Sequence, residues 1–264
     1  MKPAPFDYAA PRTVDAALGL LDEDAKVLAG GQSLVPVMNF RLARPAKLVD
    51  VNRIDELAYL RKRDGVLHIG ALTRHATLER SEVVAAGWPL LRQAVRHVGH
   101  AQIRSRGTIG GSCAHADPTA ELPVALTALD ARFHARARAG ARVIGAAAFF
   151  VSHLTSALRA DELLVEVEVP PLPDGARTAF VEYARTHGDW AIAGAAVVVA
   201  PRHAAIALLG AGPAPVRASA AETALTSGAG AADAARLAAE LVDHPWRSAL
   251  TAALVETALE EAGA

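Results

Sequence analysis

The sequence predicts an α+β protein, in which strands and helices are interleaved in some stretches and gathered in separate runs in others. Three observations support this fold class. Residues 26–50 contain a strand, a glycine turn, a helix and a second strand in close succession. Residues 59–69 alternate like a hairpin and residues 163–169 form an apolar strand. The last third of the chain places three short strands before three helices, two of them rich in alanine.

The first segment has clear start and stop signals for each element. Thr13 is a suitable N-cap, so residues 14–22 are expected to form a helix, and residues 26–28 a strand that ends at a glycine pair. Ser33 is expected to cap the next helix, with Pro36 in its first turn, where the missing N–H group costs nothing. An apolar stripe of Leu34, Val37, Met38 and Leu42 fits that helix, and residues 47–50 form the next predicted strand.

The middle of the chain mixes strands and helices. Asp64 and Gly65 fit a two-residue type I′ hairpin turn within residues 59–69. A helix is expected from Thr73, another over residues 89–98 that stops at Gly99, and a buried one over 122–129. Strands are expected at 131–135, 142–146 and 163–169.

A proline-rich connection marks the change to the last part of the chain. Residues 170–176 contain three prolines and an Asp-Gly pair, which is typical of a linker. Strands are then expected at 180–184, 195–200 and 204–209, followed by helices at 217–226, 231–242 and 246–261.

Composition excludes several classes of function. A net charge of −1 supplies no basic field, so we expect no bound nucleic acid. The N-terminus has no apolar signal segment, and no stretch has 18 uninterrupted apolar residues, so we expect no transmembrane segment and a cytoplasmic location.

Metal-centred chemistry is also disfavoured. Cys113 is the single cysteine, so the chain can form neither an internal disulfide nor a cysteine-ligated iron–sulfur cluster, and we expect this thiol to be a buried packing residue. His97, His100 and His115 lack a carboxylate cluster, so no metal site is predicted there. His75 and His187 are expected on the surface or in loops.

Two glycine pairs are the strongest functional signal. They occur in Ala29-Gly30-Gly31-Gln32-Ser33-Leu34 and in Thr108-Ile109-Gly110-Gly111-Ser112, each between an apolar run and a hydroxyl side chain. Two such bends are expected to offer bare backbone N–H groups from two sides of one cleft, which suits a diphosphate. Each pair alone is usually just a tight loop or a helix cap, and neither matches a dinucleotide fingerprint or a P-loop.

These motifs resemble a known family. The segments 29–38, 48–50 and 108–118, with Gly188-Asp189-Trp190-Ala191 and residues 210–218, are similar to the FAD-binding medium subunits of molybdenum hydroxylases, the flavoproteins of the carbon monoxide dehydrogenase and xanthine dehydrogenase type. The resemblance covers nearly the whole chain. It implies a vanillyl-alcohol-oxidase-like, PCMH-type FAD domain over 1–172, in subdomains 1–53 and 54–172. It also implies a small C-terminal domain over 177–264 with a three-stranded antiparallel sheet and helices.

The resemblance assigns a role to each matching position, and it implies cofactor-binding residues but no catalytic residue in this chain. The diphosphate of FAD is expected at Ala29, Gly30, Gly31, Gln32, Ser33, Leu34, Thr108, Gly110, Gly111 and Ser112. Asp117 or Glu121 is expected to contact the adenosine part, although Asp117 could instead cap the following helix and Glu121 could interact with the helix dipole. Leu164 is expected at the isoalloxazine ring, and Trp190 at the flavin or at a subunit interface. Relatives commonly carry two adjacent basic residues here, whereas this chain has Thr186 at the second position. Arg185 is therefore the remaining candidate for a cationic group that tunes the flavin.

The resemblance also implies a function. The chain would bind FAD noncovalently, accept electrons from [2Fe–2S] clusters on a small partner subunit and pass them to a quinone, NAD or dioxygen. Substrate hydroxylation would take place on a large molybdopterin-binding subunit, in a dimer of heterotrimers. The alternatives are a stand-alone FAD-dependent oxidase or monooxygenase, for which the sequence shows no clear general base, and a noncatalytic nucleotide-binding scaffold.

Overall fold

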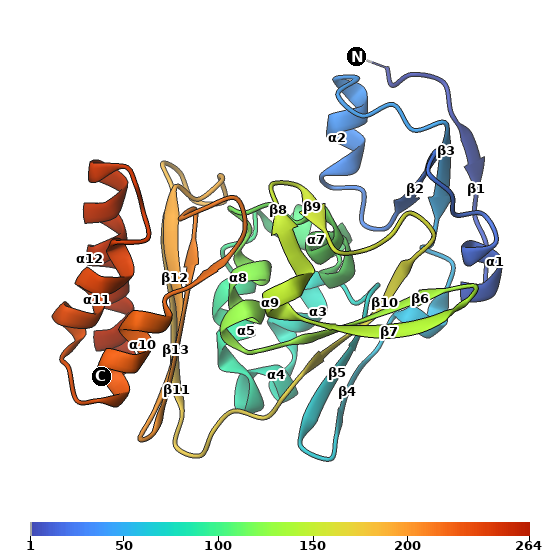
Figure 1. Ribbon diagram of the computed structural model, residues 1–264. Coiled ribbons are helices and arrows are strands. Elements are labelled where there is room, and N and C mark those ends of the chain that lie inside the picture. Colours follow the sequence, from blue (N-terminus) through green and yellow to red (C-terminus); the bar gives the residue numbers. More distant parts are fainter. Residues whose placement is uncertain (1) are drawn as a thin grey trace.

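The computed structural model describes residues 2–264, and its elements form layers (Figure 1). A small N-terminal unit stands at one corner of the molecule. Next to it lies a five-stranded sheet, then a layer of helices, then a four-stranded sheet, and finally the three C-terminal helices at the opposite side. Within residues 2–264, no helix combines the length and apolar character needed to cross a membrane.

The N-terminal unit is a parallel three-stranded sheet with the strand–turn–helix–strand order predicted from the sequence. Its strands follow the order β1-β3-β2. The elements are β1 (Asp7–Ala9), α1 (Val14–Leu18), β2 (Ala25–Leu28), α2 (Leu34–Asn39) and β3 (Lys47–Asp50).

Two local predictions in this unit were wrong, and a third was correct only in part. Helix α1 ends at Leu18, because Gly19 follows as its C-cap residue, and does not continue to residue 22. Ser33 does occupy the N-cap position of α2, but its backbone is in the helical region and its side chain makes no capping hydrogen bond. In the predicted apolar stripe only Met38 is buried, and Leu42 is 81% exposed because it lies beyond the end of the helix.

The five-stranded sheet is antiparallel in the order β4-β5-β10-β6-β7. Asp64 and Gly65 both have positive φ angles, 51° and 81°, which confirms the predicted hairpin turn. The late strand β10 lies in the centre of the sheet, with a register shift between Leu164 and Glu166. The elements are η1 (Asp55–Leu57), β4 (Leu60–Arg63), β5 (Val66–Gly70), β6 (Arg132–Ala137), β7 (Gly140–Gly145) and β10 (Leu163–Val169).

The helix layer fills the space between the two larger sheets. Its core includes Trp88, which is 1% exposed and donates its indole N–H to the Pro170 carbonyl at 2.7 Å. The helix predicted over 89–98 ends at Val95, and Gly99 adopts a φ of +46° beyond it. The elements are α3 (His75–Arg80), α4 (Glu82–Gly87), α5 (Pro89–Val95), α6 (Ala101–Arg106), α7 (Ile109–His115), α8 (Glu121–Ala128), α9 (Ala146–Phe149), β8 (Phe150–Ser152) and β9 (Thr155–Ser156).

The C-terminal sheet has four antiparallel strands, where three were expected. The additional strand, β14, is only two residues long, so it has no periodicity that a sequence could show. One face of this sheet shares a hydrophobic core with α5 and α8, and the other packs on the C-terminal helices. The elements are β11 (Arg177–Tyr183), β12 (Ala193–Ala200), β13 (His203–Leu209), β14 (Val216–Arg217), α10 (Ser219–Thr226), α11 (Ala231–Ala239) and α12 (Pro245–Glu261).

Candidate functional site

The first glycine bend follows the carboxyl end of β2 and leaves its amides free. Gly31 has a φ of +73°, a conformation that glycine adopts at little cost. The Gln32 side chain donates to the Gly30 carbonyl at 3.2 Å. None of the hydrogen bonds formed within residues 2–264 uses the amides of Gly30, Gly31, Gln32 or Ser33 as donors. Four backbone N–H groups in succession are therefore available to a ligand.

A polar network behind this bend holds its carbonyl groups in place. Asn52 Nδ2 donates to the Ala29 carbonyl and to Asp50 Oδ1, both at 2.7 Å. Arg74 in turn donates to Asn52 Oδ1 at 2.8 Å and to the Arg106 carbonyl. Burial is the main cause that lowers the pKa of Arg74, and the nearby Arg106 guanidinium lowers it further. The bend is thus fixed from behind by side chains that also make its surroundings cationic.

The second glycine pair does not form a bend with bare amides, and that prediction was wrong. Gly110 and Gly111 lie in the first turn of α7, whose N-cap is Thr108. The Gly110 amide donates to the Ala71 carbonyl at 2.9 Å, and the Gly111 amide donates to Thr108 Oγ1 at 3.1 Å. The Ser112 amide is bonded to the Thr108 carbonyl. This segment therefore offers hydroxyl groups in place of free N–H groups.

The two glycines of this pair have different surroundings. A Cβ atom at Gly110 would lie 2.6 Å from the backbone oxygen of Ala71, so this glycine is required by packing. A Cβ atom at Gly111 would lie 2.8 Å from Thr108 Oγ1 and 3.7 Å from the Ala29 side chain. Gly111 therefore faces the gap between the two glycine segments.

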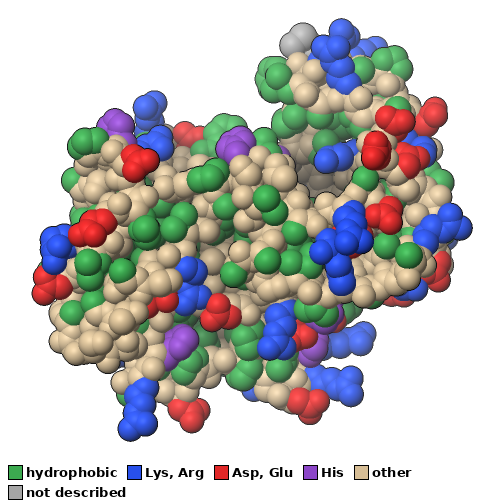
Figure 2. Space-filling model, in the orientation of Figure 1, with side chains coloured by type: hydrophobic (Ala, Val, Ile, Leu, Met, Phe, Trp, Pro, Cys, Tyr) green, Lys and Arg blue, Asp and Glu red, His purple; other side chains and the backbone are tan. Residues whose placement is uncertain are grey.

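The structure brings the two glycine segments together, as the sequence predicted. A Cβ atom at Gly30 would lie 2.5 Å from the Arg106 carbonyl oxygen and 2.8 Å from the Cα atom of Gly107, which immediately precedes Thr108. Such a close approach is possible only for glycine. The N-terminal unit joins the rest of the molecule here, and Figure 2 shows a hollow in the surface between these two parts.

His75 is a site residue that the sequence analysis placed wrongly. It was expected on the surface or in a loop, but it opens α3 and is only 3% exposed. Its Nε2 atom lies 3.1 Å from Ser112 Oγ, and burial lowers its pKa to about 4, so it is neutral at pH 7. A neutral imidazole behind Ser112 fixes this hydroxyl group without adding charge.

The two acidic residues proposed for adenosine binding lie at the start of α8. Asp117 does not cap the helix, because Ala120 is the N-cap residue, and Asp117 Oδ1 instead accepts from the Thr119 amide and hydroxyl at 2.8 and 2.7 Å. Glu121 is 9% exposed, and burial raises its pKa to about 8. The charges of Glu182, His97 and Asp117 also act on it, and Glu182 belongs to β11, so Glu121 lies at the junction with the C-terminal sheet.

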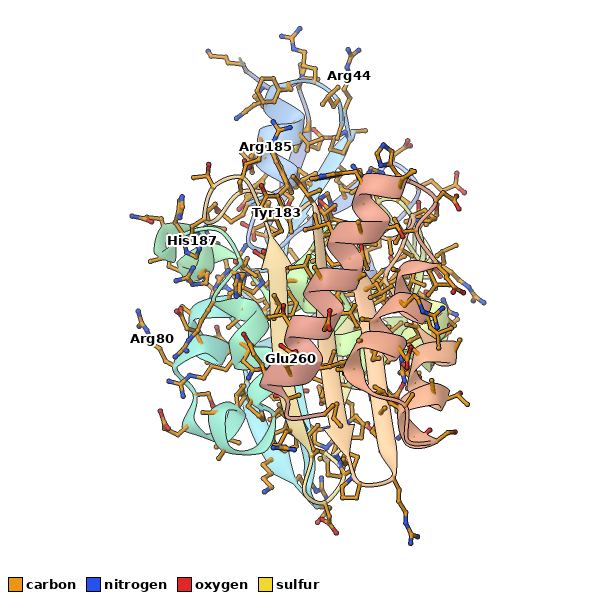
Figure 3. The ribbon with its side chains drawn as sticks, turned by 90° about the vertical axis from the view of Figure 1, so that its left-hand side faces the viewer. Arg44, Arg80, Tyr183, Arg185, His187 and Glu260 are labelled. Carbon is orange, nitrogen blue, oxygen red and sulfur yellow. The ribbon has the colours of Figure 1, made fainter. Side chains whose placement is uncertain are left out.

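The two residues proposed for the flavin ring differ in exposure. Leu164 is 4% exposed on β10 and belongs to the central hydrophobic core. Trp190 is 77% exposed, in the loop after β11. In Figure 3, Tyr183 and Arg185 lie at the end of the C-terminal sheet nearer the N-terminal unit, whereas His187 lies to one side. The structure therefore places Leu164 in the protein interior and leaves the Trp190 ring free to contact a ligand or another chain.

Comparisons with known proteins agree on one family. The profile described as "FAD binding domain in molybdopterin dehydrogenase" matches residues 4–172. The carbon monoxide dehydrogenase medium chain of Hydrogenophaga pseudoflava is 36% identical over an alignment that covers 100% of this chain and 99% of that protein. This chain belongs to the FAD-binding medium-subunit family of molybdenum hydroxylases.

Two further comparisons support the assignment of this chain to the medium-subunit family. The "6-hydroxypseudooxynicotine dehydrogenase complex subunit alpha" of Paenarthrobacter nicotinovorans is 52% identical over 202 residues, which is 75% of this chain and 68% of that protein. The structure of the Hydrogenophaga pseudoflava carbon monoxide dehydrogenase that lacks the Mo-pyranopterin moiety superposes with a TM-score of 0.93 at 38% identity. That match covers 99% of this chain and 98% of the other.

The residues of this medium subunit fit the cofactor of its family, FAD. The unpaired amides of residues 30–33 suit phosphate oxygens, and Gly30 packs against the segment that leads into Thr108 and α7. The nearby Arg74 and Arg106 guanidinium groups favour an anion. Asn52 and Arg74 were not predicted as site residues, because the sequence marks them only by their positions shortly after β3 and after β5.

Proposed function

We propose that this medium subunit transfers electrons within a three-component enzyme. A small partner subunit with [2Fe–2S] clusters would supply the electrons, and a large molybdopterin-binding subunit would hydroxylate the substrate. The proposal is supported by relatives that are named as subunits of dehydrogenase complexes. FAD, when bound, accepts electrons singly, stores two, and allows delivery to a quinone, NAD or dioxygen. We further propose a dimer of such heterotrimers, located in the cytoplasm.

The observation that carries the FAD assignment is the row of free amides at 30–33, on a bend that packs against the residues just before α7. We propose that Gly30, Gly31, Gln32 and Ser33 donate to the diphosphate through their backbone, supported by Ala29 and Leu34 on either side. Thr108 and Ser112 would add hydroxyl donors, Gly110 would set the position of the helix, and Gly111 would leave room for the phosphates. The backbone groups require no rearrangement, because the Asn52 network already holds the first bend.

The remaining contacts are assigned by the same reasoning. Asp117 or Glu121 would reach the ribose hydroxyls, and Leu164 would back the isoalloxazine ring. Trp190 would cover the flavin or a partner subunit, since its ring is exposed in this chain. Arg185 would supply a positive charge at the flavin. The domain division 1–172 and 177–264, with subdomains 1–53 and 54–172, is part of this proposal.

The cofactor is proposed to be noncovalently bound. Cys113 is fully buried on α7 and burial raises the pKa of its thiol, so it is neither accessible nor nucleophilic. Acid precipitation of the yellow protein should therefore release all of the flavin into the supernatant. Flavin that stays with the pellet would contradict this part of the proposal.

A reduction assay tests the function itself. The FAD-loaded chain is mixed anaerobically with an organic substrate of one of the related complexes, first alone and then with purified small and large partner subunits. We expect loss of the flavin absorbance near 450 nm only when the partners are present. Rapid reduction of the isolated chain by the substrate would instead support a stand-alone oxidase or monooxygenase.

A further inference from the structure

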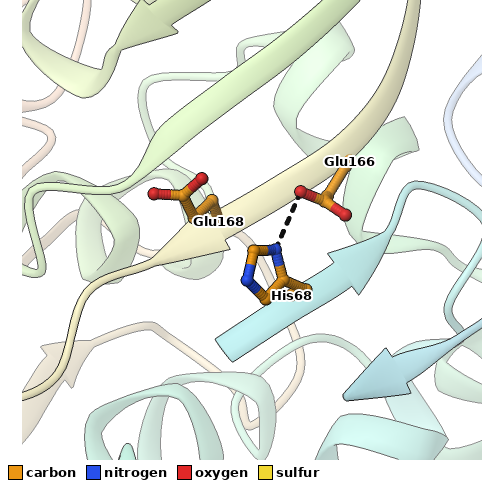
Figure 4. A group of neighbouring side chains, drawn as sticks. All are labelled: His68, Glu166 and Glu168. Atoms are coloured by element: carbon orange, nitrogen blue, oxygen red, sulfur yellow. Dashed lines mark hydrogen bonds and ion pairs between the residues drawn. The ribbon is translucent and has the colours of Figure 1, made fainter. Parts of the chain in front are cut away.

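A cluster of metal-ligating side chains lies on the five-stranded sheet, on the face opposite the core. Glu166 and Glu168 are two residues apart on β10, so they project from the same face, whereas Val167 and Val169 are fully buried on the other face. The neighbouring strands place His68 opposite Glu168 and His134 opposite Glu166. Figure 4 shows His68 and the two carboxylates drawn together on β5 and β10.

The ligand atoms of this cluster lie close to one another. His68 Nδ1 lies 3.0 Å from Glu166 Oε1, and His134 Nε2 lies 3.0 Å from Glu168 Oε2 and 3.6 Å from Glu166 Oε1. The ligand atoms of His68, Glu166 and Glu168 all lie within 4.8 Å of one another. A tetrahedral zinc ion with arms near 2.0 Å requires ligand atoms about 3.3 Å apart. The contacts of 3.0 and 3.6 Å are near this edge length, whereas His134 lies outside the group of three and its ring must rotate to complete the tetrahedron.

The outer oxygens of both carboxylates are held by separate donors. The Tyr59 hydroxyl donates to Glu166 Oε2, and Arg132 NH1 donates to Glu168 Oε1 at 3.0 Å. Each carboxylate thus has one oxygen fixed from outside and the other directed at the histidines. Such hydrogen bonds orient carboxylates in metal sites.

We propose that His68, His134, Glu166 and Glu168 bind one zinc ion or a similar divalent cation, which links the three adjacent strands β5, β10 and β6. Two imidazole nitrogens and two carboxylate oxygens are a donor set for zinc, whereas magnesium and calcium prefer oxygen ligands alone. The four side chains are between 15% and 30% exposed, so the ion can enter from solvent. None of these four residues is among the proposed flavin contacts.

The test is a zinc titration of the FAD-loaded full chain, with zinc chloride as the probe in competition with a chromogenic chelator. We expect one equivalent of zinc per chain, and an affinity that falls at least about tenfold in His68→Gln and in His134→Gln. Thermal melts should show stabilisation of the wild type by zinc, but not of these two variants. Melts without zinc and the retained flavin absorbance verify that the variants are folded.

Two matched histidine variants control for adventitious binding. His187→Gln alters a histidine whose ring lies near His97 and His100, with centroids 6.4 and 6.3 Å apart, and His203→Gln alters one at the start of β13. Both should bind zinc like the wild type. The proposal is overturned if the wild type binds no stoichiometric zinc, or if His187→Gln removes the binding while His68→Gln and His134→Gln retain it.

Discussion

Gly111 allows a direct test of where the diphosphate lies. In Gly111→Ala the added methyl group would occupy the gap between α7 and the first bend, 3.7 Å from the Ala29 side chain. It would also lie 2.8 Å from Thr108 Oγ1, so the Thr108 hydroxyl must move and its capping bond to the residue-111 amide is weakened.

Two opposing effects leave the folding free energy almost unchanged. Replacing glycine by alanine in a helix gains about 1 kcal/mol, and loss of the cap costs about 1 kcal/mol. If the diphosphate lies between the two glycine segments, FAD binding has no such compensation, because the methyl group would take space that the phosphates need. We expect the FAD dissociation constant to rise at least about tenfold, equivalent to about 1.4 kcal/mol.

The assay combines FAD fluorescence titration with urea unfolding of the FAD-free chain. Gly87→Ala is the matched control, since a Cβ atom there meets nothing within 4 Å and the residue lies at the end of α4. This control should keep the wild-type FAD affinity. Wild-type affinity in Gly111→Ala would refute the placement of the diphosphate between the two glycine segments.

Three further substitutions test other parts of the structure. Asn52→Ala should raise the FAD dissociation constant and destabilise the fold by about 1–3 kcal/mol, because the Ala29 carbonyl and Asp50 lose their hydrogen-bond donor. An FAD titration that gives the wild-type dissociation constant would contradict this. Because burial raises the pKa of Glu121 from 4.5 to about 8, the unfolded chain releases this proton at lower pH than the folded chain. The free energy of unfolding should therefore fall as pH rises between these two values, by up to about 1.4 kcal/mol per pH unit. Urea unfolding at several pH values should show this decrease in the wild type and in the control Glu240→Gln, but not in Glu121→Gln. Trp190→Phe should leave stability within about 0.5 kcal/mol and reduce the quenching of tryptophan fluorescence by FAD; unchanged quenching would assign Trp190 to a subunit interface.

Local signals accounted for much of the fold. The Asp64-Gly65 turn, the strand at 163–169 and the first glycine bend were all predictable, because each depends on residues that are adjacent in the sequence. The convergence of the two glycine segments was also predicted correctly. It followed from their shared chemistry and from the resemblance to a family, since no local pattern relates residue 30 to residue 111.

The errors arose where distant contacts decide the structure. Glycine disfavours helices, yet Gly110 belongs to α7 because the backbone of Ala71 lies against it. His75 is buried behind Ser112, although nothing in its neighbouring residues indicates this. The cluster around Glu166 draws on three strands whose pairing no single-sequence pattern reveals.

The core shared between the helix layer and the C-terminal sheet has a practical consequence for handling the protein. Phe180, Ala196, Val198 and Ala205 are buried in the same cluster as Leu90 and Leu126, which precede the connection at 170–176. A protease that cleaved this connection would leave two fragments that remain associated and elute as one species. Expression of the first 172 residues alone would expose a broad apolar surface, and we expect that fragment to aggregate.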